Sequence, residues 1–137
     1  MSGILLDSSI IIAAERRQLD LGAVTAGRLD LTHLSVITAS ELLHGVHRAD
    51  TLRRQLTRSA FVEAVLAAFP ILELDVTVAR VHARLWADLQ ATGGLIGAHD
   101  LWIAATALAH SLTILSTNAR EFGRIPGLVL EPVTLKG

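Results

Sequence analysis

Three acids and one amide occupy positions in this sequence from which they could bind a metal ion. Asp7 directly follows the apolar triplet Ile4–Leu6, and Asn118 directly follows the stretch LTILST. Glu41 and Asp100 each stand at the predicted start of a helix. Oxygen ligands of this kind suit hard divalent cations such as Mg²⁺ or Mn²⁺. A cation held by carboxylates typically activates a water molecule and neutralises the charge of a phosphate.

Asp100 leads an apolar stripe. The residues three, four, seven and eight positions after it are apolar, and this is the spacing of a helix face that becomes buried. These residues are Ile103, Ala104, Ala107 and Leu108. A single acid in this place can simply be the N-cap of its helix, accepting hydrogen bonds from free backbone N–H groups. Other acids at equivalent positions would instead indicate a site.

The other candidates also have structural alternatives. Asp7 can cap the helix that follows it, and Asn118 can be a turn residue. The segment Thr38–Glu41 matches a capping box, in which the glutamate bonds back to the backbone. All four candidates nevertheless fall at one edge of the predicted sheet. This coincidence favours a shared cleft over four unrelated caps and turns.

Carboxylates that share a cleft repel one another, and burial raises the cost of their charges. One or two Mg²⁺ or Mn²⁺ ions would relieve this conflict. We expect Asp7 and Asp100 to be the first ligands. Glu41 would complete the metal shell, directly or through water, or would orient the attacking water. Asn118 would hydrogen-bond a metal-bound water or the phosphate.

Short apolar runs alternate with stretches of helical period along the chain, which predicts an α/β fold with a mostly parallel sheet covered on both faces. Ligands of such folds bind beyond the carboxyl ends of the strands. The turn signal Pro126–Gly127 adds a fifth candidate strand, Leu128–Leu130, to the four clearer ones. The predicted strands are Ile4–Leu6, His33–Ile37, Ile71–Leu74 and Leu112–Ser116, and the predicted helices are Ser8–Arg17, Glu41–Ala49, Thr51–Phe69, Thr77–Thr92 and Asp100–His110.

Composition limits the class of protein. With 137 residues, of which 51% are hydrophobic and 18% charged, the chain predicts a single globular domain over residues 1–137. It has no cysteine, which excludes disulfides and thiolate metal sites and suits a reducing, cytoplasmic environment. The formal net charge of −1 does not by itself indicate a nucleic-acid partner. The N-terminal apolar run is interrupted by Asp7 and is too short to cross a membrane.

The sequence resembles the PIN-domain family, and most closely the VapC-type toxins of bacterial toxin–antitoxin pairs. The resemblance lies in the segments ILLDSSIIIAA, ITASELLHGVHRA, IGAHDLWIAATALAHSLTILSTNAREF and IPGLVLEP, which span nearly the whole chain in the family's order. It implies a three-layer α/β/α sandwich and an endoribonuclease that depends on Mg²⁺ or Mn²⁺. It also implies an RNA substrate, a homodimer and a cognate antitoxin.

The resemblance also assigns individual residues. Asp7, Glu41 and Asp100 match the three core acids of the family, and Asn118 matches a fourth position that is often Asp. An amide at position 118 carries one negative charge fewer, so the resemblance leaves open whether this residue binds the metal directly. Glu121 either compensates for the missing charge or is a surface acid beside its apolar neighbour.

Two other classes of protein share parts of this pattern. A DNA flap-type nuclease would use the same metal chemistry, and a regulatory module would hold a cation without catalysis. A receiver-like module ordinarily has a second acid beside the strand-end Asp and a later strand-end Lys. Here Asp7 is flanked by Leu6 and Ser8, and the only lysine is Lys136, which disfavours this interpretation.

A basic run follows Glu41 in the sequence. Arg48, Arg53, Arg54 and Arg58 stand there against a single acid, Asp50. Such a run is usually a solvated helix face, but its proximity to Glu41 makes contact with RNA phosphates an alternative.

Several histidines, serines and tryptophans are weaker candidates for functional residues. His44, His47 and His99 form no His-Glu-x-x-His arrangement, so we interpret them as polar surface residues. Ser8 and Ser9 follow Asp7, and we expect them to fix the turn and to cap the helix. Trp86 and Trp102 are predicted in the core or at a dimer contact, not as stacking platforms for bases.

Overall fold

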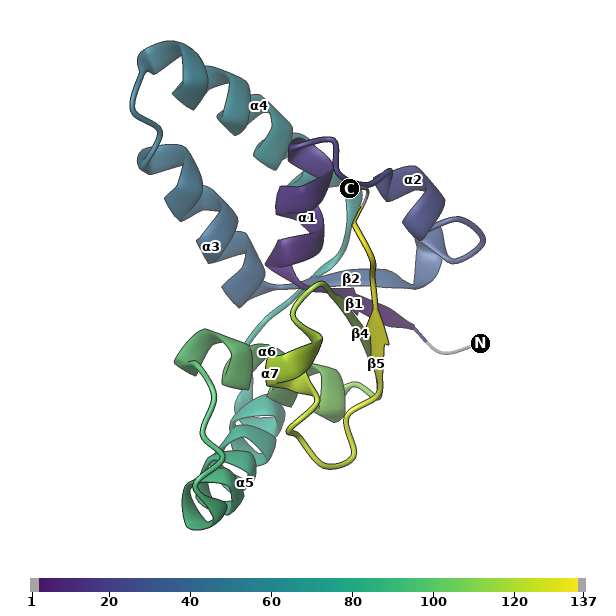
Figure 1. The fold of residues 1–137 in the computed structure, drawn as a ribbon, viewed down its shortest axis with the longest axis vertical. Coiled ribbons are helices and arrows are strands. Elements are labelled where there is room, and N and C mark those ends of the chain that lie inside the picture. The colour runs from purple at the N-terminus through teal and green to yellow at the C-terminus, as the bar shows by residue number, and fades with distance from the viewer. Residues whose placement is uncertain (1–2, 136–137) are drawn as a thin grey trace.

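The computed structural model describes residues 3–135 and has three layers, with helices on both faces of a central sheet (Figure 1). Within these residues the sheet has five parallel strands in the order β3-β2-β1-β4-β5. The strands are β1 (Ile4–Leu6), β2 (Thr32–Ser35), β3 (Ile71–Leu72), β4 (Thr113–Ser116) and β5 (Leu130–Pro132). This architecture confirms the predicted α/β class with a parallel sheet.

The helices form two groups. The α-helices are α1 (Ser8–Glu15), α2 (Leu21–Val24), α3 (Val36–His47), α4 (Leu52–Ala68), α5 (Val76–Thr92), α6 (Ala98–Ala109) and α7 (Ala119–Phe122), and a short 3₁₀ helix spans Leu29–Leu31. Figure 1 shows α1, α3 and α4 on one side of the sheet and α5, α6 and α7 on the other. Among residues 3–135 no helix has both the length and the apolar character needed to cross a membrane.

The short strand β1 serves two hydrophobic cores at once. Its alternate side chains point to opposite faces of the sheet. Ile4 and Leu6 pack with the core beneath α1, α3 and α4. Leu5 packs with the core beneath α5 and α6, which also includes Phe122 of α7. All three β1 residues are buried, because the sheet is covered on both faces.

The side on which strands are added to the sheet switches at β1. In parallel sheets such a switch point places a cleft at the carboxyl ends of the strands. From β1 the sheet grows through β2 on one side and through β4 on the other. In the register of these strands Leu6 lies opposite Leu115, and the Asp7 N–H donates to the Leu115 carbonyl at 3.0 Å. The segments that leave β1 and β4 therefore begin side by side.

The predicted boundary between β2 and α3 was wrong. The strand was expected to reach Ile37 and the helix to begin at Glu41, but α3 begins at Val36. Ser35 is its N-cap, and its hydroxyl accepts a hydrogen bond from the Ile37 N–H at 3.0 Å. The β-branched pair Val36 and Ile37 resembles the end of a strand, although it forms the first turn of the helix. Glu41 thus lies in the second turn, and the capping-box alternative for it is excluded.

Most other predicted elements agree with the structure to within two residues at each end, and β1 agrees in full. The last strand lies two residues later than predicted, at Leu130–Pro132. The four-residue helices α2 and α7 were not predicted, because a single turn is too short to show helical periodicity.

Leu115 in β4 offers a test of the core, because it is fully buried in the central sheet. Truncation to alanine (Leu115→Ala) should lower the free energy of unfolding by about 2–5 kcal/mol, through lost burial and the cavity left behind. The control Leu56→Ala removes a leucine that is 62% exposed on α4, and should change stability by about 0.5 kcal/mol or less. Urea denaturation measures both. Equal effects of the two substitutions would contradict this description of the core.

Candidate functional site

Asp7 is held at the end of β1 by hydroxyl groups. Its side chain is buried, and its Oδ2 accepts hydrogen bonds from Ser9 Oγ at 2.7 Å and from Ser116 Oγ at 2.9 Å. Backbone groups fix both hydroxyls in turn. The Thr117 N–H donates to Ser9 Oγ at 3.1 Å, and the Asn118 N–H donates to Ser116 Oγ at 2.8 Å. Asp7 stands at the N-cap position of α1 without a side-chain capping bond to any described residue, so the capping alternative is wrong.

Asp100 projects from the first turn of α6, two residues inside the helix. The N-cap is Gly97, so the N-cap alternative for Asp100 is also wrong. Burial raises the pKa of Asp100 to about 6, with further contributions from the negative charges of Asp7, Glu41 and Glu121. These acids therefore lie close enough for their charges to act on Asp100. The structure brings Asp7, Glu41 and Asp100 to one edge of the sheet, as the sequence predicted.

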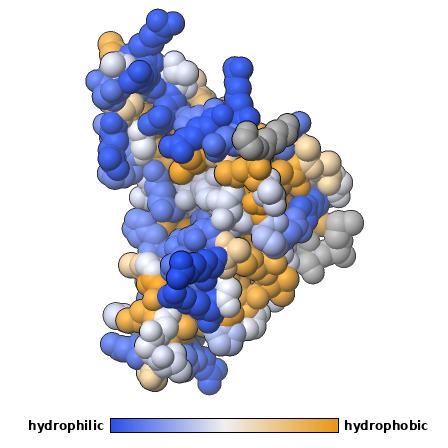
Figure 2. Space-filling model, viewed as in Figure 1, coloured by the Kyte–Doolittle hydropathy of each residue, from blue (hydrophilic) through white to orange (hydrophobic). Residues whose placement is uncertain are grey.

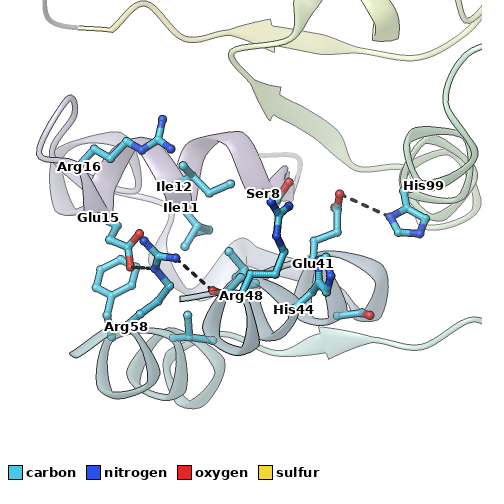
Figure 3. Close-up of a pocket in the computed structure, with 15 residues that line it drawn as sticks. Ser8, Ile11, Ile12, Glu15, Arg16, Glu41, His44, Arg48, Arg58 and His99 are labelled. Atoms are coloured by element: carbon cyan, nitrogen blue, oxygen red, sulfur yellow. Dashed lines mark hydrogen bonds and ion pairs between the residues drawn. The ribbon is translucent and has the colours of Figure 1, made fainter. Parts of the chain in front are cut away.

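Glu41 reaches this edge from the second turn of α3. Its Oε2 lies 3.5 Å from Nδ1 of His99, the residue before Asp100. Its Oε1 is buried and has no hydrogen-bond partner among the residues described. Figure 3 shows the carboxylate pointing toward His99 across the space between α3 and α6. An orphaned carboxylate oxygen is costly unless a cation or a donor satisfies it, so Glu41 is poised to accept a further partner.

Asn118 and Glu121 are the two remaining polar candidates, and both belong to the start of α7. Asn118 stands at the N-cap position of α7, and within residues 3–135 its side chain makes no capping bond. Glu121 lies in the first turn of the same helix and is partly buried. Because its charge helps to raise the pKa of Asp100, Glu121 is not an isolated surface acid.

A cavity of about 690 Å³ adjoins Glu41, which is the one of these four acids that lines it (Figure 3). It is formed mainly by α1, α3 and α4, and His99 closes it on the side of α6. Its walls combine apolar side chains with polar and charged ones. The lining includes Ile11, Ile12, Phe61, Val62, Glu41, His44, Arg48 and Arg58. The cavity is large enough for a segment of a ligand to approach Glu41.

Two residues of the basic run are already paired. Arg54 donates to Asp50 at 2.8 and 2.9 Å, with both side chains exposed. Arg58 donates to the Gly45 carbonyl at 3.1 Å and lies 3.4 Å from Glu15. Figure 2 shows a mostly hydrophilic surface over the outer ends of α3 and α4. Of the arginines in this run, Arg48 and Arg58 line the cavity.

Sequence reasoning missed the two serines that hold Asp7. Ser9 was expected to fix the turn and to cap α1; the capping part is wrong, because its hydroxyl donates to Asp7. Ser116 received no role, although it is the last residue of a buried strand and a buried hydroxyl requires a partner. The prediction of a core position holds for Trp102, which packs partly buried against the core beneath α5 and α6 and stacks on His82 with ring centroids 3.5 Å apart. It is wrong for Trp86, whose side chain is 52% exposed.

The donors at this edge fit a hard divalent cation. They are carboxylate oxygens, and one of them, Glu41 Oε1, is buried without a partner in residues 3–135. Within the same residues, no three or more His, Cys, Asp or Glu side chains are close enough together to hold an ion as they stand. Repulsion between like charges keeps such carboxylates apart, and a cation would favour their approach.

Comparisons of the sequence with a family model and with curated proteins agree on one family. The PIN domain family matches residues 4–128. The chain is 35% identical to ribonuclease VapC1 of Rickettsia felis over 134 residues, which cover 98% of each protein. It is also 33% identical to the tRNA(fMet)-specific endonuclease VapC of Salmonella typhimurium over 98 residues, or 72% of each protein.

Solved structures with the same fold include toxin–antitoxin complexes. One is VapBC2 from Rickettsia felis bound to a DNA fragment from their promoter, with a TM-score of 0.85 and 25% identity, covering 96% of this chain and 98% of that one. A further solved structure with this fold is FitAcB from Neisseria gonorrhoeae, with a TM-score of 0.84 and 30% identity, covering 94% of this chain and 97% of that one.

The raised pKa of Asp100 predicts a pH-dependent stability in the absence of metal. The folded protein holds this proton more tightly than the unfolded chain, so this contribution to stability is lost as the pH rises from about 4 to about 6. Asp100→Asn cannot ionise, and its melting temperature relative to wild type should rise across that range. Thermal melts in chelator from pH 4 to pH 7 measure the difference. Asp88→Asn, on the exposed face of α5, is the control. A difference that does not vary with pH would contradict the assignment.

Proposed function

The chain belongs to the PIN-domain family, and we propose that it is a VapC-type endoribonuclease that hydrolyses RNA phosphodiester bonds with Mg²⁺ or Mn²⁺. The observation that carries this proposal is the convergence of acids on Asp100, whose pKa rises through its burial and the nearby charges of Asp7, Glu41 and Glu121. The similarity to ribonucleases over nearly the full chain supports RNA as the substrate. We also propose that residues 1–137 form one PIN-like domain.

Asp7 and Asp100 would hold the cation, and Glu41 would complete its shell directly or through water. A bound Mg²⁺ or Mn²⁺ supplies Lewis acidity, which favours ionisation of water and neutralises phosphate charge. Glu41 Oε1, which lacks a partner among residues 3–135, is free to accept a hydrogen bond from the attacking water and orient it. The Asn118 amide would donate a hydrogen bond to the phosphate or to a metal-bound water.

The partners of the protein follow from the same family. We propose a cognate antitoxin, supported by the VapBC complexes among the structural relatives. We also propose a homodimer, as the resemblance of the sequence implies. The name of the Salmonella relative supports a transfer RNA as one RNA to test first.

The proposed roles predict the outcome of conservative substitutions. Asp7→Asn and Asp100→Asn keep the shape of the side chain and remove the charge that holds the cation. RNA cleavage in Mn²⁺ should fall by about a hundredfold or more in each, because stabilisation of transition-state charge is lost. Glu63→Gln changes an exposed acid of α4 and should leave the rate unchanged. End-mapped cleavage of total RNA by antitoxin-free protein measures this. Wild-type activity of Asp100→Asn would refute its role as a ligand.

Asn118→Asp should have opposite effects on stability and metal binding. The added negative charge would face Asp7, Glu41 and Asp100, so the melting temperature in chelator should fall. The same charge should lower the Mg²⁺ or Mn²⁺ concentration that gives half-maximal cleavage. Asn118→Ala should keep most of the metal affinity and lose rate. Metal titrations and melts of the three proteins check this. If Asn118→Asp changes neither quantity, residue 118 does not face the acids.

A further inference from the structure

The carboxylate of Asp7 is bound asymmetrically. Both hydroxyl partners, Ser9 Oγ at 2.7 Å and Ser116 Oγ at 2.9 Å, donate to the same oxygen, Oδ2. Within residues 3–135 no hydrogen bond reaches the other oxygen, Oδ1. The two oxygens of this side chain are therefore chemically different before any ligand binds.

The directions of these hydrogen bonds are fixed by donor counting. A serine hydroxyl has one hydrogen to donate, whereas an ionised carboxylate can only accept. The hydroxyls also accept from the backbone, Ser9 from the Thr117 N–H at 3.1 Å and Ser116 from the Asn118 N–H at 2.8 Å. The two hydroxyls also lie 3.4 Å from each other, but their shorter contacts to Oδ2, at 2.7 and 2.9 Å, take the one hydrogen that each has to donate. Each hydroxyl thus receives a backbone hydrogen and passes its own to Oδ2. Because a carboxylate oxygen has two lone-pair sites, both sites of Oδ2 are filled.

Burial makes this arrangement hard to replace. Asp7 is 4% exposed and Ser116 is fully buried, so water has little access to take over either bond. The backbone donors belong to the segment between β4 and α7, while Ser9 belongs to α1. Rotation of the Asp7 carboxylate would break hydrogen bonds from both elements at once. The group is thus held in one orientation by two separate parts of the fold.

This orientation limits how Asp7 can bind a cation. With Oδ2 saturated, Oδ1 is the only oxygen left, and coordination by Asp7 must be monodentate. Mg²⁺ requires a near-octahedral shell of single oxygen ligands, whereas Ca²⁺ takes six to eight ligands and readily accepts bidentate carboxylates. A carboxylate restricted to one oxygen therefore favours the smaller ion.

We propose that Ser9 and Ser116 are positioning residues that make Asp7 a monodentate ligand, and that they select Mg²⁺ and Mn²⁺ against Ca²⁺. The proposal rests on the proposed function, because it takes Asp7 as a metal ligand. It assigns to the two serines a role in the choice of ion that is separate from stability. Loss of either hydroxyl frees a lone pair of Oδ2 and permits bidentate binding.

The test compares cation affinities of Ser9→Ala and Ser116→Ala with wild type. Calorimetric titrations of the full chain with MgCl₂, MnCl₂ and CaCl₂ give the three affinities without any assay of activity. The Mg²⁺ affinity should fall by about tenfold, as for the loss of other groups that orient metal ligands, while Ca²⁺ affinity holds or rises. The ratio of Ca²⁺ to Mg²⁺ affinity should therefore rise by about tenfold or more.

Two further variants separate positioning from packing. Ser8→Ala removes the neighbouring hydroxyl, which makes no hydrogen bond to another described side chain, and should leave the ratio unchanged. Ser9→Thr keeps the hydroxyl and should restore the wild-type ratio. Melting temperatures in chelator show that each variant is folded, and Ser9→Ala carries the test if Ser116→Ala does not fold.

The outcomes are distinguishable. A higher ratio in the alanine variants, with restoration in Ser9→Thr, supports the proposal. Equal losses for all three cations, or unchanged affinities, would overturn it and leave the proposed nuclease intact. Failure of wild-type protein to bind any of the three cations would instead contradict the metal role in the proposed function, and the selectivity would fall with it.

Discussion

Repulsion between carboxylates at the carboxyl edge of the sheet is the constraint on which the site depends. Asp100 shows it most clearly, since its pKa rises to about 6 through burial and through the charges of Asp7, Glu41 and Glu121. Such an arrangement costs stability and persists only if the rest of the fold enforces it. Two hydrophobic cores, one on each face of the sheet, provide that enforcement. The elements that carry the acids are anchored in these cores.

The topology determines which acids can meet. Because β1 lies between β2 and β4 in a parallel sheet, the segments that follow β1 and β4 begin next to each other. Asp7 lies on the first segment and Asn118 on the second, and Ser9 and Ser116 link them. Glu41 and Asp100 arrive from helices on opposite faces of the sheet. The site therefore requires all three layers.

The sequence was sufficient to predict the parallel sheet and the edge at which the acids gather. Two patterns that extend over many residues carried this prediction. The strands are apolar throughout instead of alternating with polar residues, and an apolar stripe follows Asp100 along its helix. Local boundaries were harder to predict. Val36 and Ile37 favour a strand by their branching, and only the capping hydroxyl of Ser35 shows that α3 begins there. The hydrogen bond between Ser116 and Asp7 joins residues 109 positions apart, so no local pattern announces it.

The central claim is that Asp7, Glu41 and Asp100 share a divalent cation. Anomalous diffraction from crystals of the protein grown with Mn²⁺ tests it directly, because the metal is located independently of any assumption about ligands. We predict an anomalous peak among these three carboxylates, with Asp7 contributing Oδ1. A protein saturated with Mn²⁺ that shows its peak elsewhere, such as beside His44 and His47, would contradict it.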